Sequence, residues 1–183
     1  MTCKEGDGFI EALAARIRDI GFSCTRCGEC CRAGPGDGNL VMVSPSEVCR
    51  IARFSGKSPK DIAEPYPESV ILPDHREVTF GRALRRVCGD CLFYTRSSCE
   101  VYPARPAICR TYPFMLEGNN LRVFPCKGIG LPISLQDSLA LARDLVVRRE
   151  EEDKEVEGVR QLFPAIPTVP GRFLIDSEGV TRL

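Results

Sequence analysis

Hydrophobic residues recur at helical spacing in two long segments, one near each end of the chain. Residues 7–20 are expected to form a helix that ends at Gly21. Residues 134–154 are expected to form the longest helix, and its charged end at residues 148–153 is expected to face solvent. The apolar stripe of this second helix comprises Leu135, Leu139, Ala142 and Val146.

Shorter elements are predicted between these helices. The stretch from Ser44 to Glu47 forms a capping box with Pro45 at the first helical position, so a helix is expected to begin there and to stop near Gly56. Another short helix is expected to start at Ser58. Strands are expected at residues 40–43 and 78–87, and hairpins at residues 112–124 and around residues 176–179. A glycine-rich turn is expected at residues 34–38.

This mixture of elements predicts an α+β fold, a small helical domain around a cysteine-rich centre with short β-hairpins. The length of 183 residues fits a single domain that spans residues 1–183. Within it, a cysteine-rich region at residues 22–130 precedes a C-terminal helix and hairpin at residues 131–183.

The composition excludes several classes of function. Lys and Arg together number 25, as do Asp and Glu, so the chain lacks the basic signature of a nucleic-acid-binding protein. The single histidine, His75, excludes sites that need two, such as a Rieske centre or an H-E-x-x-H metallopeptidase. The sequence has neither an apolar run of membrane-spanning length nor a signal-peptide pattern. We therefore expect a cytoplasmic protein without a membrane partner.

Cysteine is the residue in excess, with 11 in the chain. In a reducing compartment this density indicates metal binding or catalysis instead of disulfides. The first block contains Cys24, Cys27, Cys30 and Cys31. Iron–sulfur proteins use a C-x₂-C-x₂-C run because each sulfur can reach a different iron. The adjacent pair at its end indicates either two metal sites or one cluster with a bystander thiol.

A second block supplies remote partners for the first, namely Cys88, Cys91, Cys99, Cys109 and Cys126. Its C-x₂-C start also allows a zinc ribbon, although a separation of about 60 residues from the first block exceeds the usual spacing of about 15–20. Cys49 lies in a predicted amphipathic helix and is expected to be buried, and Cys3 lies in a terminal segment. Neither is expected to bind metal.

Arginines flank both cysteine blocks. Beside the cysteines stand Arg26, Arg32, Arg96, Arg105 and Arg110. Eight thiolates around two divalent ions, or around two [4Fe–4S]²⁺ clusters, leave a local charge of roughly −4. We expect Arg105 and Arg110 to act as cofactor-binding residues, which offset this charge and donate hydrogen bonds to sulfur.

The spacing of these residues resembles the YkgJ-type cysteine-cluster family, also described as a zinc- or iron-chelating C-x₂-C-x₂-C-C domain. The resemblance rests on Cys24–Cys31, on Cys91–Tyr94 and on Cys99–Pro113, which contains C-x-V-Y-x₂-R-P-x₂-C-R-x-Y-P. It spans about residues 22–130. The departures are mild, with Val101, Tyr112 and Tyr94 where the family pattern has Ile, Phe and Leu.

The resemblance implies eight metal-ligating cysteines, Cys24, Cys27, Cys30, Cys31, Cys91, Cys99, Cys109 and Cys126. It leaves the metal open between zinc and iron. We expect one or two all-cysteine [4Fe–4S]-type clusters in a redox or electron-transfer role, served by a protein redox partner. The alternative is a Zn²⁺-binding protein with two structural Cys₄ sites that acts as an interaction or accessory module. In either case metal is expected to stabilise the centre. If the chain is an enzyme, it is expected to be an iron–sulfur oxidoreductase, and no catalytic residue is identified. Cys88 is an extra thiol outside the family pattern, and the sequence leaves open whether it takes the place of another ligand.

Overall fold

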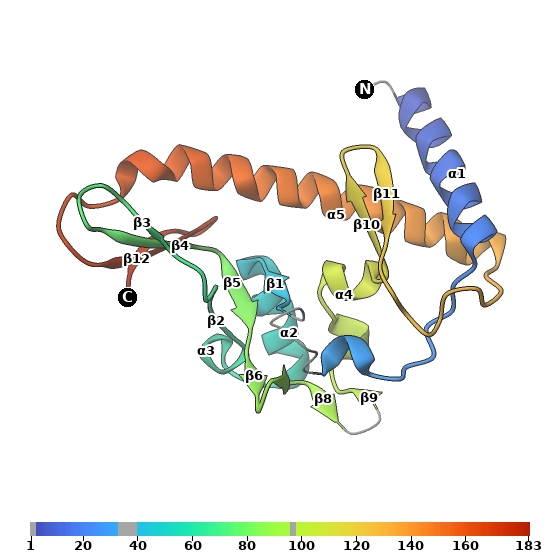
Figure 1. The fold of residues 1–183 in the computed structure, drawn as a ribbon, viewed down its shortest axis with the longest axis horizontal. Coiled ribbons are helices and arrows are strands. Elements are labelled where there is room, and N and C mark those ends of the chain that lie inside the picture. The colour runs from blue at the N-terminus through green and yellow to red at the C-terminus, as the bar shows by residue number, and fades with distance from the viewer. Residues whose placement is uncertain (1–2, 33–39, 96–97) are drawn as a thin grey trace.

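Helix α5 (Leu135–Leu162) runs along most of the long axis of the molecule, and the other elements pack along it (Figure 1). The structure is a computed structural model that describes residues 3–32, 40–95 and 98–183. The predicted turn at residues 34–38 and Arg96 lie outside these ranges. The other helices and helical turns are α1 (Cys3–Ile20), α2 (Pro45–Ser55), α3 (Pro59–Ile62), α4 (Ala107–Thr111), η1 (Glu29–Cys31), η2 (Tyr102–Ala104) and η3 (Phe163–Ala165).

Short strands form several small sheets. The strands are β1 (Met42–Val43), β2 (Ala63–Pro65), β3 (Val70–Ile71), β4 (Glu77–Phe80), β5 (Arg82–Leu84), β6 (Arg86–Val87), β7 (Asp90–Cys91), β8 (Tyr94–Thr95), β9 (Ser98–Cys99), β10 (Phe114–Glu117), β11 (Asn120–Val123), β12 (Arg172–Asp176) and β13 (Gly179–Arg182). One sheet has the order β13-β12-β4-β3, with β12 parallel to β4, and another has the order β1-β5-β2. The pairs β6–β7, β8–β9 and β10–β11 are antiparallel hairpins. The predicted α+β class is confirmed.

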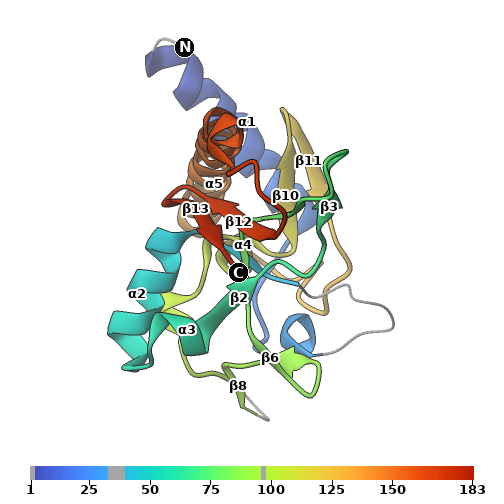
Figure 2. The same ribbon diagram turned by 90° about the vertical axis from the view of Figure 1, so that its left-hand side faces the viewer.

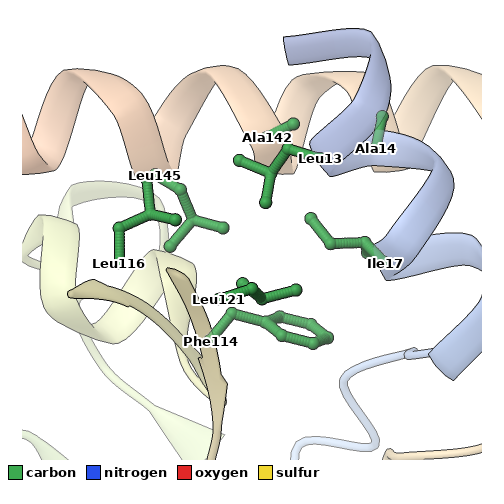
Figure 3. Packing of buried hydrophobic residues seen from close by; sticks show 8 residues of the cluster. All are labelled: Leu13, Ala14, Ile17, Phe114, Leu116, Leu121, Ala142 and Leu145. Atoms are coloured by element: carbon green, nitrogen blue, oxygen red, sulfur yellow. The ribbon is translucent and has the colours of Figure 1, made fainter. Parts of the chain in front are cut away.

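One hydrophobic core joins α1 and α5 to the β10–β11 hairpin. Figure 3 shows side chains from all three elements converging on a common interior. The buried members are Leu13, Ala14, Ile17, Phe114, Leu116, Leu121, Ala142 and Leu145. Phe22 and Ile129, which flank the two cysteine blocks, pack against this core. The ends of the cysteine-rich region are therefore attached to the best-packed helices.

Two further cores lie along the chain. The second is formed by α2, α3 and the β1-β5-β2 sheet, and its buried members are Val43, Val48, Ile51, Ile62, Ala63, Leu84, Phe93 and Val101. Cys91 and Cys99 pack against it, so part of the second cysteine block rests on a hydrophobic base. In the third core, Val159 of α5 packs against Val78 and Phe173 of the parallel strand pair.

The predicted start and end of α2 are confirmed. Ser44 accepts a hydrogen bond from the Glu47 N–H at 3.3 Å, and the Glu47 carboxylate accepts one from the Ser44 N–H at 3.1 Å. Gly56 follows the helix with a left-handed φ of 72°. The helix predicted from Ser58 is a single turn, because the chain enters strand β2 directly afterwards.

The prediction for α5 needs correction. The helix extends to Leu162. Ala142 is buried, and Leu139 and Val146 pack against the core as predicted. The buried face also includes Ser138, Leu145 and Arg148, which the predicted stripe did not contain. Leu135 is 57% exposed, whereas Arg148, in the segment expected to face solvent, is 6% exposed. Burial of Arg148 is possible because its guanidinium donates hydrogen bonds to Thr111 and Glu152. Hydrophobic spacing alone cannot signal a buried arginine of this kind.

Candidate metal centre

A cavity of about 290 Å³ lies where the two cysteine blocks meet. Figures 1 and 2 show the blue turn η1 next to the green hairpins β6–β7 and β8–β9. Eight cysteines line the cavity, namely Cys24, Cys27, Cys30, Cys31, Cys91, Cys99, Cys109 and Cys126. These are the eight cysteines that the family resemblance implied as ligands. The fold thus brings the whole expected set to one place.

The first cysteine block forms an irregular loop after α1 and ends in η1. Gly28 precedes this turn with a left-handed φ of 73°. A Cβ atom at Gly28 would overlap the ring of Tyr94 in β8. Both the backbone conformation and the close approach of the Tyr94 ring therefore favour glycine here. This contact seats the first block against the second.

Backbone hydrogen bonds join the two ends of the cysteine-rich region. The Ser23 N–H donates to the Gly128 carbonyl at 3.1 Å, and the Gly130 N–H donates to the Gly21 carbonyl at 3.0 Å. A Cβ atom at Gly128 would collide with the Ser23 carbonyl oxygen. The pairing places Cys126 beside the start of the first block.

Several sulfur atoms of the second block accept a hydrogen bond from the backbone N–H two residues further on. These sulfurs belong to Cys91, Cys99 and Cys126. The bond to Cys126 comes from Gly128 and is 3.4 Å long. Each bond lowers the pKa of its thiol because it stabilises the thiolate, the form that binds metals.

Helix α4 presents Cys109 to the cavity. Pro106 occupies the N-cap, and its carbonyl accepts hydrogen bonds from the N–H groups of Cys109 and Arg110, both at 3.0 Å. Tyr102 and Tyr112, which lie on either side of α4 in the sequence, line the same cavity. Their rings form part of a wall that limits the access of water to the sulfurs.

Burial and mutual repulsion control the ionisation of these thiols. Burial is the largest cause of a raised pKa at Cys91, Cys99, Cys109 and Cys126. A thiolate at Cys30 raises all four pKa values further, whereas the positive charge of Arg105 lowers the pKa of Cys99 and Cys109. A cation in the cavity would favour the thiolate forms together.

Cys30 and Cys31 have sulfur atoms 3.9 Å apart. A hydrogen bond between them lowers the pKa of Cys30 to about 7 and raises that of Cys31. Tetrahedral zinc with Zn–S bonds of about 2.3 Å places its sulfurs about 3.8 Å apart. Adjacency in the sequence therefore does not by itself assign these two cysteines to different sites.

Arg105 belongs to the cavity wall, and Arg110 does not. The Arg105 guanidinium carbon lies 3.8 Å from the centroid of the Tyr102 ring, over which Arg26 lies at 4.5 Å. The Arg105 Nε atom is buried and has no hydrogen-bond partner among the described residues. Arg110 Nε is buried as well, but it faces Asp144 of α5 at 3.9 Å.

Two further cysteines lie outside the cavity wall. Cys88 and Cys49 are both exposed. The expectation that Cys49 is buried is wrong, because Val48 and Ile51 supply the buried face of α2. The side chain of Cys3 belongs to the part of the chain that the structure does not describe.

The cysteine sulfurs surround the cavity without closing on a single point. Within residues 3–32, 40–95 and 98–183, no three Cys, His, Asp or Glu side chains are close enough together to hold one ion. The donor set nevertheless fits soft metals, because thiolates select zinc and iron–sulfur clusters over hard cations.

Sequence reasoning missed Arg86. This residue pairs with Cys91 across the β6–β7 hairpin, and its charge lowers the pKa of that thiol. One terminal nitrogen of Arg86 is buried without a hydrogen-bond partner among the described residues. The available signal was the Cys88-Gly89 pair, a two-residue turn that places positions 86 and 91 opposite each other.

Residues 23–127 match the CxxCxxCC family model, whose description is "Putative zinc- or iron-chelating domain". The chain belongs to the CxxCxxCC family. This confirms the resemblance inferred from the cysteine spacing, and the match includes all eight cysteines of the cavity wall. Membership in CxxCxxCC identifies zinc or iron chelation as the class of chemistry of this region.

A curated relative of this chain is the uncharacterized protein MJ0661 of Methanocaldococcus jannaschii. It is 26% identical over 110 residues, which cover 57% of this chain and 50% of that protein. The CxxCxxCC chain thus spans about half the length of the curated relative it matches. No solved structure matches significantly. In the described part of the chain, no helix combines the length and apolar character needed to cross a bilayer.

Proposed function

We propose that the cavity binds iron and sulfide as one or two [4Fe–4S]-type clusters in a redox or electron-transfer role. The observation that carries this proposal is that eight cysteines from both blocks line a single cavity of about 290 Å³. This volume is many times the roughly 10–15 Å³ that suffices for one water molecule. It is therefore large enough for a polynuclear group. A bound cluster supplies one-electron transfer.

The surrounding residues suit such a group. Arg86 and Arg105 bring positive charge and buried nitrogens without hydrogen-bond partners among the described residues, and both lower thiol pKa values in the wall. Together with the backbone N–H bonds, they would offset negative charge and raise the reduction potential of a cluster. Tyr102 and Phe93 would exclude water from one side.

We further propose that the eight ligands divide into two quartets. Backbone pairing places Cys126 beside the first block, and the charges that raise its pKa are those of the first block. A thiolate at Cys91 raises the pKa of both Cys31 and Cys109, and so does a thiolate at Cys30, which lies at the boundary between the two groups. The first quartet is Cys24, Cys27, Cys30 and Cys126. The second quartet is Cys31, Cys91, Cys99 and Cys109, with the Cys30–Cys31 pair at the boundary.

The zinc alternative is supported by a separate observation. The 3.9 Å between the Cys30 and Cys31 sulfurs matches the edge of a tetrahedral zinc site, so in this alternative the two cysteines would share one ion and the quartets proposed for the clusters would not apply. Two Cys₄ sites would use the same eight thiolates. Because such sites are closed, they would serve as scaffolding for an interaction or accessory module.

The metal and sulfide content of protein purified without oxygen separates the two proposals. Iron at about four or eight per chain with equal acid-labile sulfide, and absorbance near about 400 nm that dithionite bleaches, would support the cluster. About two zinc ions per colourless chain would refute it in favour of two Cys₄ sites. Absence of both metals from freshly purified and reconstituted protein would refute both proposals.

The cellular setting follows from the same chemistry. A cavity of free thiols is best maintained in a reducing compartment, so we place the protein in the cytoplasm. In the cluster proposal it exchanges electrons with a protein partner, and any enzymatic activity is that of an iron–sulfur oxidoreductase.

A further inference from the structure

Helix α4, which carries Cys109, is held from two sides by charged side chains. Glu47 of α2 accepts a hydrogen bond from the Ala107 N–H, with 2.7 Å between N and Oε1. Arg148 of α5 donates a hydrogen bond to the Thr111 hydroxyl, with 3.0 Å between Nη1 and Oγ1. Figures 1 and 2 show α4 below α5 and near α2.

The Glu47 carboxylate accepts two backbone hydrogen bonds, one from each of two segments. Its Oε2 atom accepts the Ser44 N–H in the capping box of α2, while Oε1 accepts the Ala107 N–H. The side chain is 12% exposed, which strengthens both bonds relative to bonds at the surface. Arg50, one turn further along α2, donates to the carbonyl of Arg105, 3.3 Å away. Helix α2 thus fixes the backbone that leads into α4.

Arg148 holds the other end of α4 through its hydrogen bond to Thr111. Its side chain is 7% exposed, and its Nε atom donates to Glu152 at 2.6 Å. Thr111 is fully buried, and its hydroxyl donates in turn to the carbonyl of Ala107 at 3.0 Å. A continuous chain of hydrogen bonds therefore runs from Arg148 through both ends of α4 to Glu47.

A helix of five residues cannot maintain its conformation alone, because a single helical turn is unfavourable in isolation. Helix α4 nevertheless carries Cys109 in the cavity wall, directly after Arg105 and Pro106. The hydrogen bonds from Ala107 to Glu47 and from Arg148 to Thr111 hold the backbone of α4 in its helical conformation. They do so with buried charges, which are costly unless they are well bonded.

We infer that Glu47, Thr111 and Arg148 are positioning residues for the metal site, which hold α4 so that Cys109 and Arg105 face the cavity. This inference rests on the proposed function, since the site it serves is the proposed one. The three residues act through α4. None of them lines the cavity.

The test compares Thr111→Val with Thr111→Ser in the full-length chain. Valine removes the hydroxyl at nearly constant shape, whereas serine retains it. Thr79→Val is the matched control, because Thr79 is a buried threonine whose hydroxyl bonds to two carbonyls in the region of the β13-β12-β4-β3 sheet. Titration of the metal-free proteins with Co²⁺ alone, followed by its thiolate charge-transfer absorbance, measures metal affinity. Alkylation of Cys109 in the metal-free proteins, followed by mass spectrometry, measures the order of α4 without metal.

Thr111→Val is expected to weaken Co²⁺ binding by about tenfold or more and to speed alkylation of Cys109, because loss of an outer contact typically costs about 10–100-fold in metal affinity. Thr111→Ser is expected to match the wild type, and Thr79→Val to lose stability without a change in either measurement. Should Thr111→Val not fold, Glu47→Gln is expected to show the same two effects.

Two failures are distinguishable. If the wild type binds neither Co²⁺, zinc nor iron, the proposed function fails, and the alkylation rates still decide whether the contacts order α4. If Thr111→Val changes Co²⁺ affinity and Cys109 alkylation no more than Thr79→Val does, the inference is overturned while the proposed function stands.

Discussion

Replacement of Gly28 by alanine should disturb the metal centre more than the protein as a whole. An alanine at a left-handed φ of 73° costs about 1–2 kcal/mol relative to glycine. The new methyl group would also overlap the Tyr94 ring, and overpacking of this kind costs about 1–3 kcal/mol more. We expect the first cysteine loop to relieve that overlap by moving away from the β8–β9 hairpin, which would separate the two blocks.

Gly56→Ala provides the matched control. Gly56 has a φ of 72°, but a Cβ atom there meets nothing within 4 Å. The control therefore carries the backbone strain alone. Each kcal/mol shifts the midpoint of thermal unfolding by about 2–4 °C in a chain of this size. We expect a shift of that order for Gly56→Ala, a larger one for Gly28→Ala, and a fall in metal affinity of about 10–100-fold only for Gly28→Ala.

Thermal unfolding of the two variants measures their stability, and competition with a chelator measures their metal affinity. A further variant, Tyr94→Ala combined with Gly28→Ala, removes the ring and should recover part of the lost metal affinity. If Gly28→Ala and Gly56→Ala have the same midpoint and the same metal affinity, the proposed seating of the first block against Tyr94 is incorrect.

Two further predictions concern the metal centre. Cys126→Ser and Cys99→Ser should each remove the metal of a different quartet and leave about half the metal content of the wild type. Cys49→Ser should leave the metal content unchanged. If elemental analysis finds the same metal content in Cys126→Ser and Cys49→Ser, the division of the ligands into two quartets is refuted. Removal of metal by a chelator should speed amide exchange in residues 24–32 and 88–109, because ligation and local order are coupled. The core of α1, α5 and the β10–β11 hairpin should keep its protection, and equal exchange with and without metal would contradict this coupling.

The elements that the sequence predicted well are those with local signals. The capping box at Ser44, the glycine stops at Gly21 and Gly56, and the hairpin at residues 114–123 all depend on neighbouring residues, and all are present in the structure. The set of eight cysteines could also be recognised from the sequence, because the cysteine spacing forms a long pattern. That these eight cysteines bind metal was implied by the resemblance, whereas their arrangement around one cavity was not predicted.

The features that sequence reasoning missed depend on contacts between distant segments. Arg148 belongs to a run of charges that predicts solvent exposure, and only the packing of α4 against α5 buries it. Cys49 sits on a helix whose hydrophobic face is occupied by other residues. Arg110 looked equivalent to Arg105 in the sequence, yet it does not line the cavity, and its Nε atom lies 3.9 Å from the carboxylate of Asp144 in α5.

The pairing of Gly21 and Ser23 with Gly128 and Gly130 has a consequence for how ligands assemble. Cys24 and Cys126 are each tethered by a few residues to a junction that helix packing already holds closed. Their encounter is therefore intramolecular and short-range, with a high effective concentration, instead of requiring the closure of a long loop. An incoming metal would meet thiols from both ends of the region at once. Capture at this end of the cavity should consequently be fast and nearly independent of how the intervening segment is ordered.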